Sequence, residues 1–402
     1  NFLCCFNDRH HVDYVNEIDD ELEIEQISDE EAYPFITWVG EEVDEAYYKA
    51  VMGIEINPGL DKSDFKIVYS PQHGADNIPV RTCLKRLGYD IVPVLAQCAP
   101  DPDYTNTKSP NPEVDASYEL AIKLAKEVDA DVVAITDPDG DRLGVVAKHN
   151  GEYVLMSGNQ SAAVYLEYIL SQRKEKGTLP DNAVMYNTIV TSDLGELVAR
   201  NYGVDVEKTL TGFKFIGDKI RKYEKTHEKQ FIFGYEESYG CVVEDFVRDK
   251  DAVQAVLLAA ECGNYYKKQG KDLIDVLNEL YAKYGTFKES QIALAKAGAA
   301  GAARIKEMMD TLRQDKPTEI GGVKVVLSED YATSERSDGT TIDLPKSNVL
   351  KYYLEDGSWI AARPSGTEPK CKFYFSIKGK DAKDAADKTE VFHKAMMELI
   401  GE

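Results

Sequence analysis

A chain of 402 residues, 43% of them hydrophobic, is long enough to bury the cores of two to four domains. Its net charge of −24 and pI near 4.7 exclude a surface that attracts nucleic acid or anionic membranes. No apolar run approaches the ~20 residues that span a bilayer, and no signal peptide opens the chain. The seven cysteines form no CxxC pattern, so we expect a cytoplasmic protein with reduced thiols.

Residues 1–50 do not show the pattern of a complete domain, and we expect them to be the remnant of a first α/β domain with its linker. In chain order the sequence predicts a strand at 2–6, a helix at 13–18, a strand at 22–25, an acidic loop at 29–33 and a helix at 41–52.

From residue 51 to residue 156 strands and helices alternate, which predicts an α/β domain with a mainly parallel sheet. In such sheets ligands gather at the carboxyl ends of the strands. His73 and an aspartate-rich loop both follow strands; His73 is either catalytic or a hydrogen-bonded loop residue. The predicted elements are strands at 65–69, 90–95, 131–135 and 143–147, with helices at 76–87 and 115–128.

The loop from Thr136 to Arg142 places Asp137, Asp139 and Asp141 at every second position between two strands. Alternate side chains of an extended backbone share a face, so the three carboxylates can converge. All-oxygen ligands favour a hard divalent cation such as Mg²⁺. The plain alternative is an acidic hairpin turn. An EF-hand would require a glutamate at its twelfth position, which is Lys148 here.

Residues 157–290 predict a third α/β unit whose loops carry further candidates. Glu236 and Ser238 lie two apart after a strand and could bind neighbouring sugar hydroxyls, although an exposed acidic turn fits as well. Lys214 and Arg142 are phosphate contacts, general acids or plain surface charges. Residues 248–251 suggest a salt-bridged interdomain face. The predicted elements are helices at 160–172 and 193–201, strands at 183–189, 204–210 and 231–233, a helix opening within 211–217, and two helices within 251–284.

Residues 291–402 mix strands and helices in a way that predicts a separate α+β domain. The stretch from Arg363 to Lys370 lies between two strands and offers a guanidinium, two hydroxyls and a glycine, which together suit phosphate; an ordinary turn is the alternative. The predicted elements are loop and helix start at 293–303, helices at 304–312 and 381–400, and strands at 323–326, 349–354, 359–362 and 371–377.

These loops, in this order, resemble those of the phosphohexomutase superfamily (the alpha-D-phosphohexomutases), and among them the phosphoglucomutases. The matching stretches are Ser70 to Gly74, Thr136 to Arg142, Thr211 to Lys214, Gly234 to Ser238, and Arg363 to Lys370. The resemblance covers about residues 40–402. It implies repeated α/β domains with mixed or parallel sheets, followed by a C-terminal α+β domain of the TATA-binding-protein-like kind.

The resemblance also implies roles, residue by residue. Asp137, Asp139 and Asp141 match the Mg²⁺ ligands. The residues matched to the transferring phosphoryl group are Arg142 and Lys214, with His73 as a further catalytic candidate; Glu236 and Ser238 match the sugar loop; and Arg363, Ser365, Gly366, Thr367 and Lys370 match the loop that binds the other phosphate.

The implied reaction interconverts glucose 1-phosphate and glucose 6-phosphate through glucose 1,6-bisphosphate and an enzyme phosphoserine. The family's Thr-Ala-Ser-His-Asn-Pro-like serine loop does not occur in this sequence, and Lys108 to Pro112 is only a superficial look-alike without the histidine. We therefore expect this chain to be inactive alone. We also expect it to be a monomer or a weak homodimer. Three alternatives stay open: a mannose-phosphate or pentose-phosphate mutase, a non-catalytic sugar-phosphate-binding module, and a phosphatase with Asp137 as nucleophile.

Overall fold

The computed structural model describes residues 27–296, 298–365 and 369–402. The chain divides into two units, with the boundary between Tyr47 and Tyr48. Among the described residues, no helix is long and apolar enough to cross a membrane. Five of the cysteines are described, and all five are buried free thiols: Cys83, Cys98, Cys241, Cys262 and Cys371.

The first unit contains a short helix, α2 (Asp29–Ala32), followed by a 3-10 turn, η3 (Tyr33–Phe35). The loop predicted at 29–33 is therefore wrong. The side chains of Ser28 and Glu31 each accept the other residue's backbone N–H, and this capping box starts a helix whose dipole the acidic first turn favours. The predicted helix at 41–52 is confirmed as α3 (Glu41–Met52). The elements predicted at 2–6, 13–18 and 22–25 lie outside the described residues.

The next segment folds around a five-stranded sheet in the order β2-β1-β3-β4-β5. The first three strands are parallel, as predicted, whereas β4 and β5 run antiparallel to their neighbours. The strand β5 was not predicted. The elements are β1 (Lys66–Ser70), α4 (Asn77–Arg86), β2 (Asp90–Pro93), η4 (Leu95–Gln97), η5 (Asp115–Tyr118), α5 (Glu119–Val128), β3 (Val132–Thr136), β4 (Leu143–His149) and β5 (Glu152–Met156).

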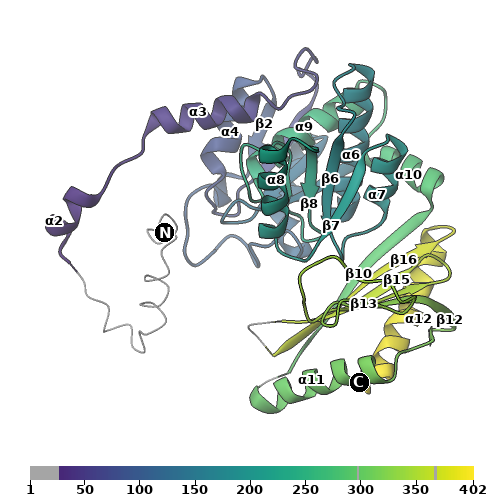
Figure 1. Ribbon diagram of the computed structural model, residues 1–402. Coiled ribbons are helices and arrows are strands. Elements are labelled where there is room, and N and C mark those ends of the chain that lie inside the picture. The colour runs from purple at the N-terminus through teal and green to yellow at the C-terminus, as the bar shows by residue number, and fades with distance from the viewer. Residues whose placement is uncertain (1–26, 297, 366–368) are drawn as a thin grey trace. The chain divides into compact units, whose positions relative to one another are not determined.

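A second sheet follows in the order β7-β6-β8-β9, with β7, β6 and β8 parallel. Helix α9 is buried on all sides because it packs against strands of both sheets (Figure 1). The elements are α6 (Gly158–Glu175), β6 (Ala183–Thr188), α7 (Leu194–Asn201), β7 (Asp205–Thr209), α8 (Lys214–Thr226), β8 (Gln230–Tyr235), β9 (Cys241–Val242), α9 (Ala252–Lys267) and α10 (Leu273–Tyr284).

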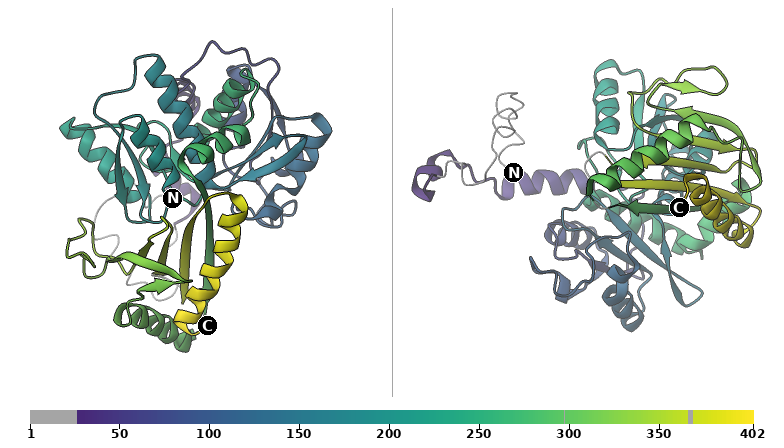
Figure 2. Two further views of the ribbon diagram at one scale, coloured as in Figure 1. Left: turned by 90° about the vertical axis from the view of Figure 1, so that its right-hand side faces the viewer. Right: turned by 90° about the horizontal axis from the view of Figure 1, so that it is seen from below.

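The C-terminal segment is an antiparallel sheet in the order β10-β16-β15-β14-β12-β11, with β13 paired to β12. Two helices cover one face of this sheet (Figure 2), which agrees with the predicted α+β class. The elements are β10 (Thr286–Ala295), α11 (Gly298–Gln314), β11 (Glu319–Ile320), β12 (Val323–Asp330), β13 (Glu335–Arg336), β14 (Leu350–Leu354), β15 (Trp359–Pro364), β16 (Lys370–Gly379) and α12 (Ala382–Ile400).

Strand β10 corrects the loop predicted from residue 293. All ten residues of β10 pair with β16, so Ala293 to Ala295 are the end of a strand. The two faces of the sheet alternate along β15, as the strand period requires. Ile360 packs with α11 and α12, while Trp359 packs with Ile189 and its neighbours from the preceding α/β segment. The C-terminal sheet is thus anchored on both faces.

Candidate functional site

The three aspartates lie in the loop between β3 and β4, which pair antiparallel. One oxygen from each of Asp137, Asp139 and Asp141 lies within 4.8 Å of the others. The loop is folded by Asp137 itself, whose Oδ1 accepts the backbone N–H groups of Asp141 at 3.0 Å and of Arg142 at 2.9 Å. The loop is a hairpin connection between strands, which excludes the helix-flanked EF-hand, and its carboxylates converge.

The electrostatics of this loop favour a bound cation. Burial raises the pKa of Asp137 to about 7, and the negative charges of Asp141 and Asp139 act in the same direction. The Arg142 Nε lies 3.5 Å from Asp137 and 3.4 Å from Asp141, so a cationic group already faces two of the carboxylates. Three convergent carboxylates, one of them buried, fit a hard divalent ion.

The segment after β1 packs against the aspartate loop from one side. The Ala75 N–H donates to the Pro138 carbonyl at 2.9 Å, and a Cβ on Gly74 would lie 2.5 Å from the Pro138 Cα. Asp76, which sequence reasoning missed, is buried beside Gly140. Burial raises its pKa to about 7, and the charges of Asp251 and the loop aspartates add to the shift. A fourth carboxylate therefore increases the negative potential of the loop.

His73 lies in the same segment after β1, in a left-handed conformation with φ of 64°. Its Nδ1 bonds to the Ala99 carbonyl at 2.7 Å, and its Nε2 is buried without a hydrogen-bond partner among the described residues. The imidazole is thus oriented by the backbone, while its catalytic role stays a prediction.

The start of α9 reaches the aspartate loop from the other side. The Ala252 N–H donates to the Gly140 carbonyl at 3.0 Å, and Lys250 Nζ lies 3.1 Å from the Asp141 carboxylate. The segment 248–251 was predicted to be an interdomain face, and it does join the third segment to the second. Sequence reasoning missed that Lys250 also belongs to the site, because its partner is remote in sequence.

The predicted sugar loop lies between β8 and β9. Glu236 is buried, and its Oε1 accepts the Gly212 N–H at 2.8 Å, which brings the sugar loop to the segment that carries Lys214. Burial raises the pKa of Glu236. Lys214 is exposed at the start of α8, with its ammonium 5.2 Å from the Phe215 ring, and Ser238 is half-buried.

The sugar loop and the aspartate loop are joined directly. The Leu143 N–H donates to the Tyr239 carbonyl at 2.9 Å. A Cβ on Gly240 would lie 2.0 Å from the Lys250 side chain, so glycine at this position leaves room for the lysine. Two loops that are distant in sequence therefore form one continuous surface.

A cavity of about 150 Å³ lies behind the sugar loop and reaches the C-terminal sheet. Its lining includes Glu113, Glu237, Glu289 and Tyr374. Glu237 accepts the Thr188 hydroxyl at 3.1 Å. Burial raises the pKa of Glu237 to about 7, with the charge of Glu236 as the next cause. The native state therefore keeps a proton on Glu237 at a pH where the unfolded chain has lost it.

The Glu237→Gln variant should gain stability over the wild-type chain as the pH is raised from 5 to 8. The pKa rises from 4.5 to about 7 on folding, so the stability of the wild-type chain falls as pH rises through this window. The variant-minus-wild-type free energy of unfolding should increase by about 1–3 kcal/mol between pH 5 and pH 8, measured by urea denaturation. The exposed Glu152→Gln variant is the control, and a difference independent of pH would contradict the burial of this carboxyl.

The predicted phosphate loop connects β15 to β16 and is closed by the Ser365 N–H, which donates to the Lys370 carbonyl at 2.7 Å. Gly366 and Thr367 lie outside the described residues. Arg363 lies beside the Tyr374 phenol, whose pKa burial raises to about 12; the Glu237 charge raises it further and Arg363 lowers it. The guanidinium and the sugar-loop cavity thus meet at one tyrosine.

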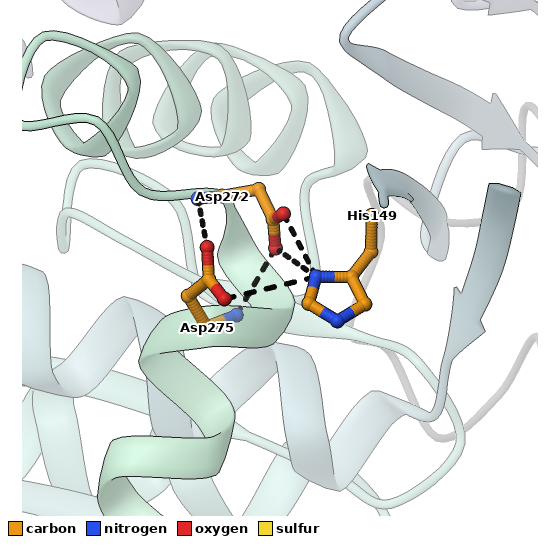
Figure 3. Close-up of side chains that lie close together, drawn as sticks. All are labelled: His149, Asp272 and Asp275. Atoms are coloured by element: carbon orange, nitrogen blue, oxygen red, sulfur yellow. Dashed lines mark hydrogen bonds and ion pairs between the residues drawn. The ribbon is translucent and has the colours of Figure 1, made fainter. Parts of the chain in front are cut away.

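A second group of possible metal ligands, His149, Asp272 and Asp275, is satisfied by hydrogen bonds (Figure 3). Asp272 caps α10 by accepting the N–H groups of Ile274 and Asp275, and His149 Nδ1 lies 2.8 Å from its carboxylate. The positive end of the helix dipole disfavours a further cation at this position. The cluster ties the end of β4 to α10.

The fold and the site define a multidomain α/β protein in which an acidic loop with convergent carboxylates, a carboxylate-and-hydroxyl loop and a basic loop follow one another along the chain. Residues 45–151, 157–284 and 298–392 match the three domains described as phosphoglucomutase/phosphomannomutase alpha/beta/alpha domain II, alpha/beta/alpha domain III and C-terminal domain. The chain belongs to the phosphoglucomutase/phosphomannomutase family, and the predicted resemblance is confirmed.

Two curated relatives are named phosphoglucomutase. The protein of Staphylococcus aureus strain MRSA252 is 36% identical over 93% of this chain and 68% of its own length. That of Staphylococcus epidermidis strain ATCC 12228 is 38% identical over 84% of this chain and 62% of its own length. The chain thus spans about two thirds of the length of the curated relatives that it matches.

Two solved structures share the fold. The pp63/parafusin phosphoglucomutase of Paramecium has a TM-score of 0.66 at 18% identity and covers 89% of this chain and 63% of its own. A phosphoglucomutase/phosphomannomutase family protein of Burkholderia thailandensis has a TM-score of 0.62 at 18% identity, with 89% and 64% covered. These likenesses confirm the predicted class of repeated α/β domains.

Proposed function

We propose that this chain is the metal-, sugar- and phosphate-binding part of a phosphoglucomutase, which interconverts glucose 1-phosphate and glucose 6-phosphate. The observation that carries the proposal is the direct junction of the aspartate loop with the sugar loop through Leu143 and Tyr239. A sugar phosphate beside this junction would reach a divalent ion and hydroxyl-binding groups at the same time. The names of the relatives support glucose phosphate as substrate.

In this proposal each loop has a separate task. Asp137, Asp139 and Asp141 hold Mg²⁺, which when bound neutralises charge on the transferring phosphoryl group. Arg142 and Lys214 place positive charge beside that group, and we assign the same task to Lys250, whose Nζ lies 3.1 Å from the Asp141 carboxylate. His73 is the candidate for proton transfer. Glu236 and Ser238 bind sugar hydroxyls, and the phosphate that stays in place is bound by Arg363, Ser365, Gly366, Thr367 and Lys370.

The reaction requires a phosphoserine and glucose 1,6-bisphosphate as intermediate and activator. Because the sequence contains no serine loop of the family's kind, we expect this chain to bind ligands but not to turn them over. The predictions of a cytoplasmic location and of a monomer or weak homodimer stand alongside this proposal.

The proposal predicts that turnover appears only when a phosphoserine domain is added. A Mg²⁺-dependent glucose 1-phosphate assay with added glucose 1,6-bisphosphate would compare this chain with a version extended upstream by such a domain. We expect activity in the extended form alone. Turnover by the shorter chain would contradict the serine requirement, and a preference for mannose or pentose phosphates would change the substrate. An aspartyl-phosphate trapped on Asp137 would instead identify a phosphatase.

A further inference from the structure

The Arg142 guanidinium lies between two groups of carboxylates. Its Nε faces Asp137 at 3.5 Å and Asp141 at 3.4 Å, while its Nη1 donates to Glu113 Oε1 at 2.7 Å. The side chains of Arg142 and Glu113 are 31% and 20% exposed, so solvent screens this ion pair only in part. The shortest and best directed contact of Arg142 is therefore with Glu113, outside the aspartate loop.

The position of Glu113 is fixed by the loop that carries it. The Glu113 N–H donates to Asn111 Oδ1 at 2.9 Å, and the Tyr118 hydroxyl donates to the Pro112 carbonyl at 2.7 Å. That hydroxyl also packs on Gly144 in β4, where a Cβ would lie 1.9 Å from it. Glycine at 144 therefore lets the loop dock two residues after Arg142, which places Glu113 opposite the guanidinium.

The second oxygen of Glu113 is also engaged. Gln291 in β10 donates its amide N–H to Glu113 Oε2 at 3.2 Å. Gln291 pairs with Tyr374 in β16, the tyrosine that lies beside Arg363. The carboxylate is thus held from the C-terminal sheet on one side and holds Arg142 on the other.

We propose that Glu113 is a positioning residue, which keeps the Arg142 guanidinium from falling onto the aspartates that bind the metal. An arginine 3.4–3.5 Å from two of these carboxylates competes with a divalent ion for them. When an ion enters, Glu113 gives the guanidinium a fixed acceptor beside the ion instead of releasing it to solvent. The proposal rests on the proposed function insofar as Arg142 then faces the transferring phosphoryl group.

The test is a double-mutant cycle on metal affinity, with Mn²⁺ as a paramagnetic probe titrated into the full 402-residue chain and followed by electron paramagnetic resonance. We expect Glu113→Gln to weaken Mn²⁺ binding about fivefold, because Arg142 turns further onto the aspartates. In the Arg142→Gln background the same change should have less than about a twofold effect. The exposed Asp115→Asn is the matched control for loss of one charge.

The results distinguish the positioning role of Glu113 from the metal site on which the proposed function depends. If the wild-type chain binds Mn²⁺ and Glu113→Gln behaves like Asp115→Asn, or weakens binding equally without Arg142, the positioning role is overturned while the metal site stands. If the wild-type chain binds no Mn²⁺, the metal site and the proposed function fall, and the role of Glu113 with them. Should Glu113→Gln fail to fold by circular dichroism, Glu113→Asp, which withdraws the carboxylate by one methylene, should show the same Arg142-dependent loss.

Discussion

The Asp139→Asn substitution should lower the Mg²⁺ affinity of this chain by at least about 100-fold without lowering the stability of the metal-free chain. Asp139 is the exposed member of the aspartate triad, whereas Asp137 is buried and also folds the loop by accepting two backbone N–H groups. Replacing Asp139 therefore removes a ligand and relieves repulsion without breaking the turn. Isothermal titration with Mg²⁺ and thermal unfolding without metal measure the two effects separately.

The exposed Asp181→Asn is the control for this experiment, because it removes the same charge from a turn outside the site. Its Mg²⁺ affinity should match that of the wild-type chain. An Asp139→Asn chain that still binds Mg²⁺ normally would show that the ion does not use the triad. A large fall in melting temperature would show that Asp139 has a structural task that its exposure does not suggest.

The convergence of the aspartates could be predicted from sequence because the three carboxylates are close together in the chain. Asp137, Asp139 and Asp141 lie within one hairpin, so the spacing alone brings their oxygens together. Lys250 and Glu113 reach the same place from other segments, through the start of α9 and the loop before α5. No local pattern encodes such meetings, since they depend on how one sheet packs against the next.

The fold shows the same division between local and remote causes. The helix α3 follows from its own periodicity and was predicted with the correct bounds. Strand β10 was missed because Phe287 is its only buried residue and its stability comes from pairing with β16, far along the chain. Residues 29–33 were misread because an acidic composition concealed a capping box between Ser28 and Glu31.

Replacing Lys250 with methionine should change metal binding and turnover in opposite directions. The Lys250 ammonium lies 3.1 Å from Asp141 and competes with a divalent ion, so its loss should tighten Mn²⁺ binding about threefold. In the proposed function the same loss removes a positive charge beside the transferring phosphoryl group, and kcat of the upstream-extended protein should fall about 100-fold or more. Methionine keeps the length that fills the space beside Gly240, so the loop junction should persist.

The exposed Lys222→Met on α8 is the control. If Mn²⁺ affinity and kcat fall together, Lys250 serves the folding of the loops, and if kcat does not change, the phosphoryl group lies elsewhere.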